Sequence, residues 1–306
     1  MVELGAVAQP RLNPERDPSD FSILELGGAH ALHKHEVSHH LGGAAPASAA
    51  ATRVPHMNYY GGPVVQKTKI YKVLYGGTGS YQSFVTAATT PSVASMFADV
   101  SGSAYFAWLT EYNTTSPVQT IGLGSYGGSF TITPATSRNG STITDTQIQA
   151  EISAQISAGF LPAPDNNSIY MTFFPKGKKI SQGGSASCVA GGFCAYHGTF
   201  TRNGQYVFYG VLPDMSAGSG CDAGCGGGTP FANQTSVASH ELIEVVTDPA
   251  VGLATVYGPP LAWYDPRNGE IGDICNAQQG TILANGTTYT VQKEWSNQAK
   301  ACIVHK

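Results

Sequence analysis

Charged side chains are scarce in this 306-residue chain: Asp, Glu, Lys and Arg make up 12% of it, about half the usual share in globular proteins. Sixteen basic and twenty acidic residues give a net charge of −4, so the chain lacks the positive excess that drives non-specific nucleic-acid binding. It also lacks any run of about 18 apolar residues, the length a membrane-spanning helix needs. We therefore expect neither a nucleic-acid partner nor a membrane span.

Several common signatures are absent as well. There is no G-x-S-x-G nucleophile elbow and no P-loop, and the glycine-rich runs at 183–192 and 218–228 carry cysteines but no phosphate-binding lysine. The first ten residues lack the basic start and apolar stretch of a secretory signal peptide. The missing motifs exclude the nucleotide-binding and serine-hydrolase classes that they would mark. The missing signal peptide leaves the route of export open.

Cysteine is missing from the first 187 residues, after which six occur. An even number at short spacings, without repeated C-x-x-C motifs, favours disulfides in an oxidising compartment over a zinc ribbon; buried free thiols are the alternative. Because the first two spacings are so short, we predict sequential pairing: Cys188–Cys194, Cys221–Cys225 and Cys275–Cys302.

The chain divides by composition into a leader and a folded part. Residues 1–55 are rich in Pro, Gly, Ala and His and are predicted to form a flexible, propeptide-like segment, whose clustered histidines are His30, His33, His35, His39 and His40. Residues 56–306 are predicted to form one domain, because apolar strand-like runs such as 69–75, 168–174 and 206–212 alternate with helical patterns such as 92–100 and 145–158. We expect an α/β or α+β fold with a mixed sheet and packed helices.

The strongest chemical signal is the segment from Thr235 to Pro249, with the sequence TSVASHELIEVVTDP. We predict a helix that begins near Asn233, Thr235 or Ser236 and ends before Pro249. On it His240 and Glu244 lie one turn apart on one face, as the two histidines do in the H-E-x-x-H helix of zinc peptidases. Both side chains can bind Zn²⁺, and Glu241 would then act as general base on the attacking water. Ordinary surface carboxylates are the alternative, but the helix is too apolar to be exposed, and buried carboxylates need a partner or a metal.

A catalytic zinc site needs a third protein ligand. Glu270 and Asp273, three residues apart in the sequence GEIGDIC, are two candidates, and one could bind the metal while the other orients His240. His197, in the strand of a predicted hairpin around Asn203-Gly204, is the third.

Several segments together resemble the EXORDIUM-like (phosphate-induced protein) family of extracellular plant proteins. The resemblance covers most of residues 59–302 and is carried by segments that include CAYH at 194–197, SHELIEVVTDP at 239–249, AWY at 262–264 and EIGDIC at 270–275. It implies an exported, disulfide-containing protein, and it matches the candidate site residues His197, His240, Glu241, Glu244, Glu270 and Asp273. The family resemblance implies no defined reaction, and Asp248 stands where the family usually has Asn.

From these observations we predict a secreted zinc-dependent metallopeptidase-like hydrolase with Glu241 as general base and a peptide or protein substrate. A non-catalytic extracellular, cell-wall binding or signalling protein with a structural metal site is the alternative.

Overall fold

The computed structural model describes residues 31–33, 53–77 and 79–306, and for 31–33 the backbone only. At its centre is a six-stranded mixed sheet in the order β1-β11-β12-β8-β3-β6. The predicted mixed sheet with packed helices is confirmed. The strands are β1 (Ala31–His33), β11 (Phe193–Arg202), β12 (Gln205–Leu212), β8 (Ser168–Phe173), β3 (Lys69–Tyr75) and β6 (Ser125–Ile132).

The sheet combines parallel and antiparallel pairs. Strands β12, β8, β3 and β6 run parallel to one another, whereas β11 forms an antiparallel hairpin with β12 and also pairs antiparallel with β1. The predicted hairpin is confirmed, with Asn203 and Gly204 in the left-handed backbone conformation that its turn requires. The predicted leader lies mostly outside the described residues; its described strand, β1, pairs with the edge of β11.

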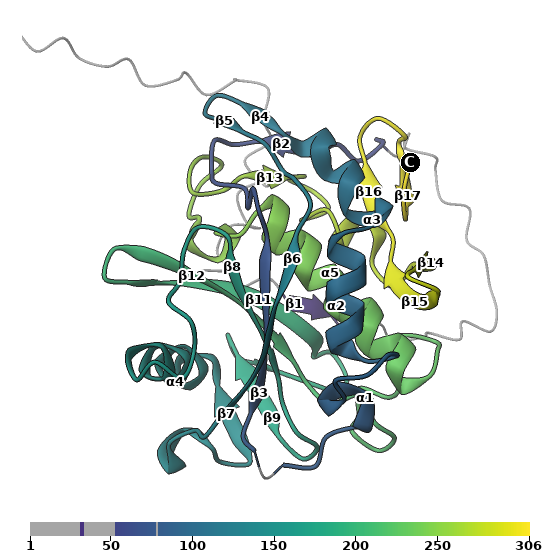
Figure 1. The fold of residues 1–306 in the computed structure, drawn as a ribbon. Coiled ribbons are helices and arrows are strands. Elements are labelled where there is room, and N and C mark those ends of the chain that lie inside the picture. The colour runs from purple at the N-terminus through teal and green to yellow at the C-terminus, as the bar shows by residue number, and fades with distance from the viewer. Residues whose placement is uncertain (1–30, 34–52, 78) are drawn as a thin grey trace, which may run out of the picture.

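Helices cover the sheet on both faces (Figure 1). Helices α2 (Val93–Ser101) and α5 (Pro230–Thr247) pack on one face, and α4 (Asp145–Ser157) packs on the other. Because side chains alternate along a strand, β3 sends Ile70 and Leu74 into the core under α5 and sends Tyr71 and Val73 toward α4. Two apolar cores therefore hold the sheet, and the first of them surrounds α5.

Helix α5 is longer than the sequence predicts. The side chain of Thr229 caps it by accepting a hydrogen bond from the backbone N–H of Ala232, and Pro230 occupies its first turn, where a missing N–H costs nothing. The predicted start at Asn233, Thr235 or Ser236 is therefore wrong. The helix ends at Thr247, as the following Asp248-Pro249 pair predicts. Every residue from Asn233 to Thr247 is buried, which confirms the burial inferred from the apolar residues of the helix.

The remaining elements are short. Two antiparallel pairs flank the sheet near α5: β14 (Gln279–Ala284) with β15 (Thr287–Gln292), and β16 (Glu294–Ser296) with β17 (Ala301–Ile303). The other strands form the pairs β2 (Asn58–Tyr59) with β13 (Trp263–Tyr264) and β4 (Thr114–Thr115) with β5 (Val118–Gln119), and a small sheet of β7 (Thr142–Thr144), β9 (Lys179–Gln182) and β10 (Ser185–Ala186). The other helices are α1 (Ser83–Thr86) and α3 (Ala104–Ala107). The 3₁₀ turns are η2 (Trp108–Tyr112), η3 (Thr136–Arg138), η4 (Val251–Leu253) and η5 (Asp273–Cys275).

All six cysteines form disulfides, but two of the three predicted pairs are wrong. The bonds are Cys188–Cys221, Cys194–Cys225 and Cys275–Cys302, of which only the last was predicted. The turn between residues 188 and 193 is closed by the backbone instead, since the N–H of Cys188 donates to the carbonyl oxygen of Phe193. The loop carrying the next two cysteines runs against this turn, where a Cβ on Gly220 would lie 2.2 Å from the carbonyl oxygen of Cys188. Cys188 at the start of the turn and Cys194 just after it therefore each bond to one cysteine of the loop.

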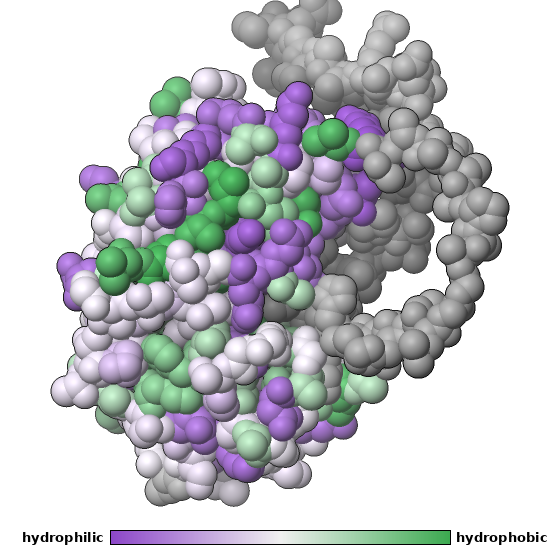
Figure 2. Space-filling model, turned by 90° about the vertical axis from the view of Figure 1, so that its right-hand side faces the viewer, coloured by the Kyte–Doolittle hydropathy of each residue, from purple (hydrophilic) through white to green (hydrophobic). Residues whose placement is uncertain are grey.

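In the described part of the chain, no helix has both the length and the apolarity to cross a membrane. On the face shown in Figure 2, hydrophilic, weakly polar and hydrophobic residues are intermixed. This mixture matches a composition poor in charge and rich in Ser, Thr and Gly.

Candidate metal centre

Helix α5 carries three of the predicted site residues at the centre of the fold. His240, Glu241 and Glu244 are at most 1% exposed. His240 and Glu244 are one turn apart, and Nε2 of His240 lies 3.1 Å from Oε1 of Glu244. His240 and Glu244 therefore lie on one face of the helix, as their spacing in the sequence predicts.

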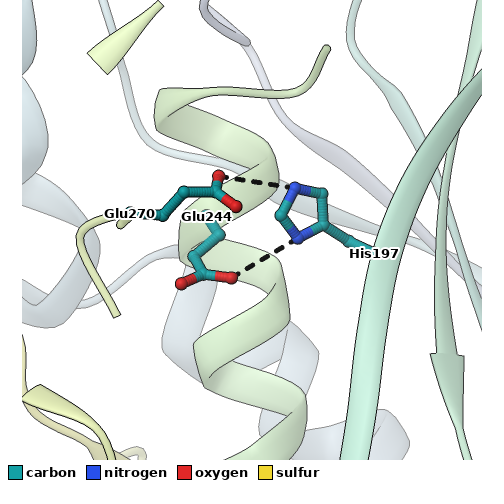
Figure 3. A group of neighbouring side chains, drawn as sticks. All are labelled: His197, Glu244 and Glu270. Carbon is teal, nitrogen blue, oxygen red and sulfur yellow. Dashed lines mark ion pairs between the residues drawn. The ribbon is translucent and has the colours of Figure 1, made fainter. Parts of the chain in front are cut away.

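Strand β11 places His197 directly opposite α5. Its Nδ1 lies 3.3 Å from Oε2 of Glu241 and 3.4 Å from Oε2 of Glu244. Its Nε2 lies 3.5 Å from Oε1 of Glu270, so a carboxylate faces each side of the ring (Figure 3). His197 was one of three candidates for a third ligand, and the structure brings it to the helix.

Residues 265–275 bring Glu270 and Asp273 to the same place. The segment folds back in a turn in which Asp265 and Gly269 exchange backbone hydrogen bonds. Asp273 then donates its N–H to Oε1 of Glu244 at 3.1 Å and accepts the N–H of Glu270 through Oδ2. Gly272 permits this close approach, because a Cβ there would lie 2.6 Å from Nδ1 of His240 and 2.9 Å from Oε1 of Glu244.

The five predicted ligands form two triads that share one residue. The first is His197, Glu244 and Glu270, and the second is His240, Glu244 and Asp273; in each, one ligand atom per residue lies within 4.8 Å of the others. All three candidates for the third ligand are therefore at the site. The triads group Asp273 with His240 and Glu270 with His197. The division of roles, in which one of Glu270 and Asp273 binds the metal while the other orients His240, stays a prediction.

Burial and mutual charge shift the pKa of the two histidines and of the three glutamates in the cluster. Desolvation disfavours charged histidines, but nearby carboxylates outweigh it and raise the pKa of His197 and His240 well above its usual value. Desolvation raises the pKa of Glu241 and, more strongly, of Glu270. For Glu244 the two histidines outweigh desolvation and lower the pKa. The opposite shifts of Glu244 and Glu270 follow from their neighbours, because two histidines face Glu244 whereas desolvation dominates at Glu270.

Three residues that the sequence did not suggest support the cluster. Gln292, at the end of β15, donates through Nε2 to the carbonyl oxygen of Gly272 at 2.9 Å and contacts Nδ1 of His240. Behind it, the hydroxyl of Tyr105 donates to the buried Glu294 at 2.9 Å. Burial raises the pKa of Glu294, and the charge of His240 opposes this shift. The chain contains no local pattern around 292 that marks a partner for a histidine 52 residues away.

The donor set fits a divalent cation. Imidazole nitrogens and carboxylate oxygens are ordinary ligands of Zn²⁺ and of other first-row divalent metals. Within the described residues, Nε2 of His197, Nε2 of His240 and Oε1 of Glu241 are buried without a hydrogen-bond partner. Such atoms are rare in native proteins and call for an explanation such as a bound ion. The buried His/Glu group can therefore hold a metal ion.

Comparisons of the chain with protein-family models, with curated proteins and with solved structures find no match.

Proposed function

We propose that the protein is a metal-dependent hydrolase of peptide bonds, with zinc as the cation and Glu241 as the general base. The observation that carries the proposal is the assembly of one helix turn, His240-Glu241-x-x-Glu244, with His197, Glu270 and Asp273 from two other segments. His240, Glu244 and Asp273 would hold the cation on one side, and His197 and Glu270 complete the cluster on the other. When bound, the cation supplies Lewis acidity that polarises a carbonyl group and makes a water easier to deprotonate.

Glu241 has the properties of a proton acceptor in such a reaction. Its Oε2 contacts His197 at 3.3 Å, whereas its Oε1 has no hydrogen-bond partner among the described residues. Burial raises the pKa of Glu241, and a carboxylate with a raised pKa takes up a proton from water more readily. Glu241 would take this proton and pass it to the amine that leaves. Of the six site residues, only Asp273 is partly exposed, so a substrate would approach on its side.

The test is proteolysis of an unstructured substrate such as casein by purified protein. We expect chelation to abolish cleavage and added Zn²⁺ to restore it. Glu241→Gln should lower kcat by about 10²–10⁴-fold, the usual contribution of a general base, while metal content stays unchanged. Glu151→Gln is the matched control, because Glu151 is also buried but pairs with Arg138 beside α4. Full cleavage by a zinc-loaded Glu241→Gln variant would show that the assigned base is wrong.

A structural metal site is the second candidate, and the burial of the cluster favours it. His197, Glu241 and Glu270 are 0% exposed, as in a site that stabilises the fold rather than receiving a substrate. This alternative predicts that chelation lowers the melting temperature while no cleavage is found in any metal state. A peptidase predicts cleavage that depends on both the metal and Glu241.

We further propose that the protein acts outside the cell, in contact with peptides and the cell wall. Three disulfides support this proposal, since such bonds persist in oxidising compartments. Membership of the EXORDIUM-like family stays a prediction from the sequence.

A further inference from the structure

Glu244 presents its two carboxylate oxygens to two different histidines. Oε1 lies 3.1 Å from Nε2 of His240, and Oε2 lies 3.4 Å from Nδ1 of His197. The rings come from different elements, α5 and β11, so the carboxylate stands between two imidazoles. A carboxylate in this position can offer one oxygen to each of two cations.

Each histidine has its own further carboxylate. His197 faces Glu270, 3.5 Å from Nε2, and His240 shares its triad with Asp273. Each triad thus consists of one imidazole and two carboxylates, and Glu244 is the only residue common to both.

A second observation points to a ligand in each triad separately. Nε2 of His197 and Nε2 of His240 are buried and make no hydrogen bond within the described residues. Each of these nitrogens faces a carboxylate oxygen of its own triad. Each half of the cluster therefore contains one imidazole that can bind a cation; in the His197 half, Nε2 faces Glu270 and Nδ1 faces Glu244.

We propose that this centre binds two divalent cations bridged by Glu244, one with His240 and Asp273 and the other with His197 and Glu270. Two dications also match the charge of the four carboxylates Glu241, Glu244, Glu270 and Asp273. In two-metal hydrolases the cations lie about 3.5–4 Å apart and act together on the attacking and leaving groups. The catalytic meaning of the pair rests on the proposed function, but the binding of two cations does not.

Metal content measures the proposal directly. Apoprotein of the full chain is dialysed against Zn²⁺ or Mn²⁺, and bound metal is counted by mass spectrometry. We expect two equivalents in the wild-type protein, one in Asp273→Asn, one in Glu270→Gln and loss of both in Glu244→Gln. Glu151→Gln, with a buried carboxylate elsewhere, should retain two.

The electron paramagnetic resonance spectrum of the Mn²⁺-loaded wild-type protein gives a readout that needs no variant. Two bridged ions should produce a magnetically coupled spectrum, whereas Asp273→Asn should give that of an isolated ion. Circular dichroism tests whether each variant is folded. If Glu270→Gln does not fold, the number of bound cations is decided by the wild-type spectrum and by Asp273→Asn, whose substitution lies at a partly exposed position.

Three results would overturn the two-cation centre: saturation of the wild-type protein at one equivalent, retention of two equivalents by both triad variants, or loss of all metal from each of them. One equivalent together with Glu241-dependent cleavage would overturn this inference and leave the proposed function standing. Two equivalents without any cleavage would support the two-cation centre and overturn the proposed function.

Discussion

Gln292 contacts His240 through the nitrogen of its side-chain amide, although the two residues are 52 positions apart in the sequence. The same nitrogen donates to the carbonyl oxygen of Gly272 at 2.9 Å, and the backbone N–H of Gln292 donates to Oγ of Ser239. One residue of β15 therefore joins helix α5 to the 270–275 segment at the point where His240 and Asp273 meet.

Replacing Gln292 by leucine should weaken metal binding. A histidine that binds a cation through Nε2 keeps its proton on Nδ1 and needs an acceptor there; the amide can supply Oε1 by turning, and leucine cannot. We expect metal affinity to fall about 10–100-fold, the usual effect of removing such a partner, measured by competition with a chelator. Gln234→Leu is the control, because Gln234 is also buried on α5 but lies outside both triads. Equal losses in both variants would contradict a role for Gln292 at His240.

Gly272→Ala should disrupt the site through sterics alone. The added Cβ would lie 2.6 Å from Nδ1 of His240 and 2.9 Å from Oε1 of Glu244, so the 270–275 segment must move away from α5. We expect at least a tenfold loss of metal affinity, seen by titration with Zn²⁺, together with a fall in melting temperature. In Gly227→Ala the new Cβ meets nothing within 4 Å, and this variant should bind metal normally. Wild-type affinity in Gly272→Ala would mean that the segment does not need this close approach.

Removing the disulfide Cys275–Cys302 should cost both stability and metal affinity. The bond closes a loop with a sequence separation of 27 residues, and the chain-entropy relation assigns such a loop about 3–4 kcal/mol. Cys275 also ends η5, the turn that begins with Asp273, so its release loosens a ligand. Denaturant unfolding of the double Cys→Ser variant tests the first effect and metal titration tests the second. A loss of stability with unchanged metal affinity would show that this disulfide does not support the metal site.

The protein should unfold cooperatively at alkaline pH because many of its tyrosines are buried. Burial is the largest cause of the raised pKa of these tyrosines, which are Tyr75, Tyr81, Tyr105, Tyr112, Tyr126, Tyr170, Tyr196, Tyr209, Tyr264 and Tyr289. Above pH of about 10 the unfolded chain loses these phenolic protons while the folded chain retains them, so the free energy of unfolding falls as pH rises. Burial lowers the pKa of Lys72, so this residue makes the free energy of unfolding rise with pH. As a single group, it does not offset the ten tyrosines.

The measurement is a pH titration from 8 to 12 that follows circular dichroism and tyrosinate absorbance on the same sample. The two signals should change together at a pH above that of free tyrosine. Tyrosinate that forms gradually near pH 10, while the circular dichroism stays constant, would show that these phenols ionise within the folded protein.

The sequence by itself determined the local structure and the chemical identity of the site. Alternating and helical patterns predicted β3, β8, α2, α4 and the β11–β12 hairpin, and the spacing of His240 and Glu244 put two candidate ligands on one helix face. These features depend on neighbours within a few residues along the chain, where periodicity and turn chemistry act directly.

Only the tertiary structure decided how distant parts meet. It showed that Cys188 and Cys194 bond to the 221–225 loop rather than to each other, that Glu270 and Asp273 lie beside different histidines, and that Gln292 contacts His240. No local pattern encodes such contacts, because they depend on where strands and loops far apart in the sequence are placed by the packing of the apolar cores. The same packing put both oxygens of Glu244 within reach of two imidazoles, a relationship that the spacing of residues on one helix leaves open.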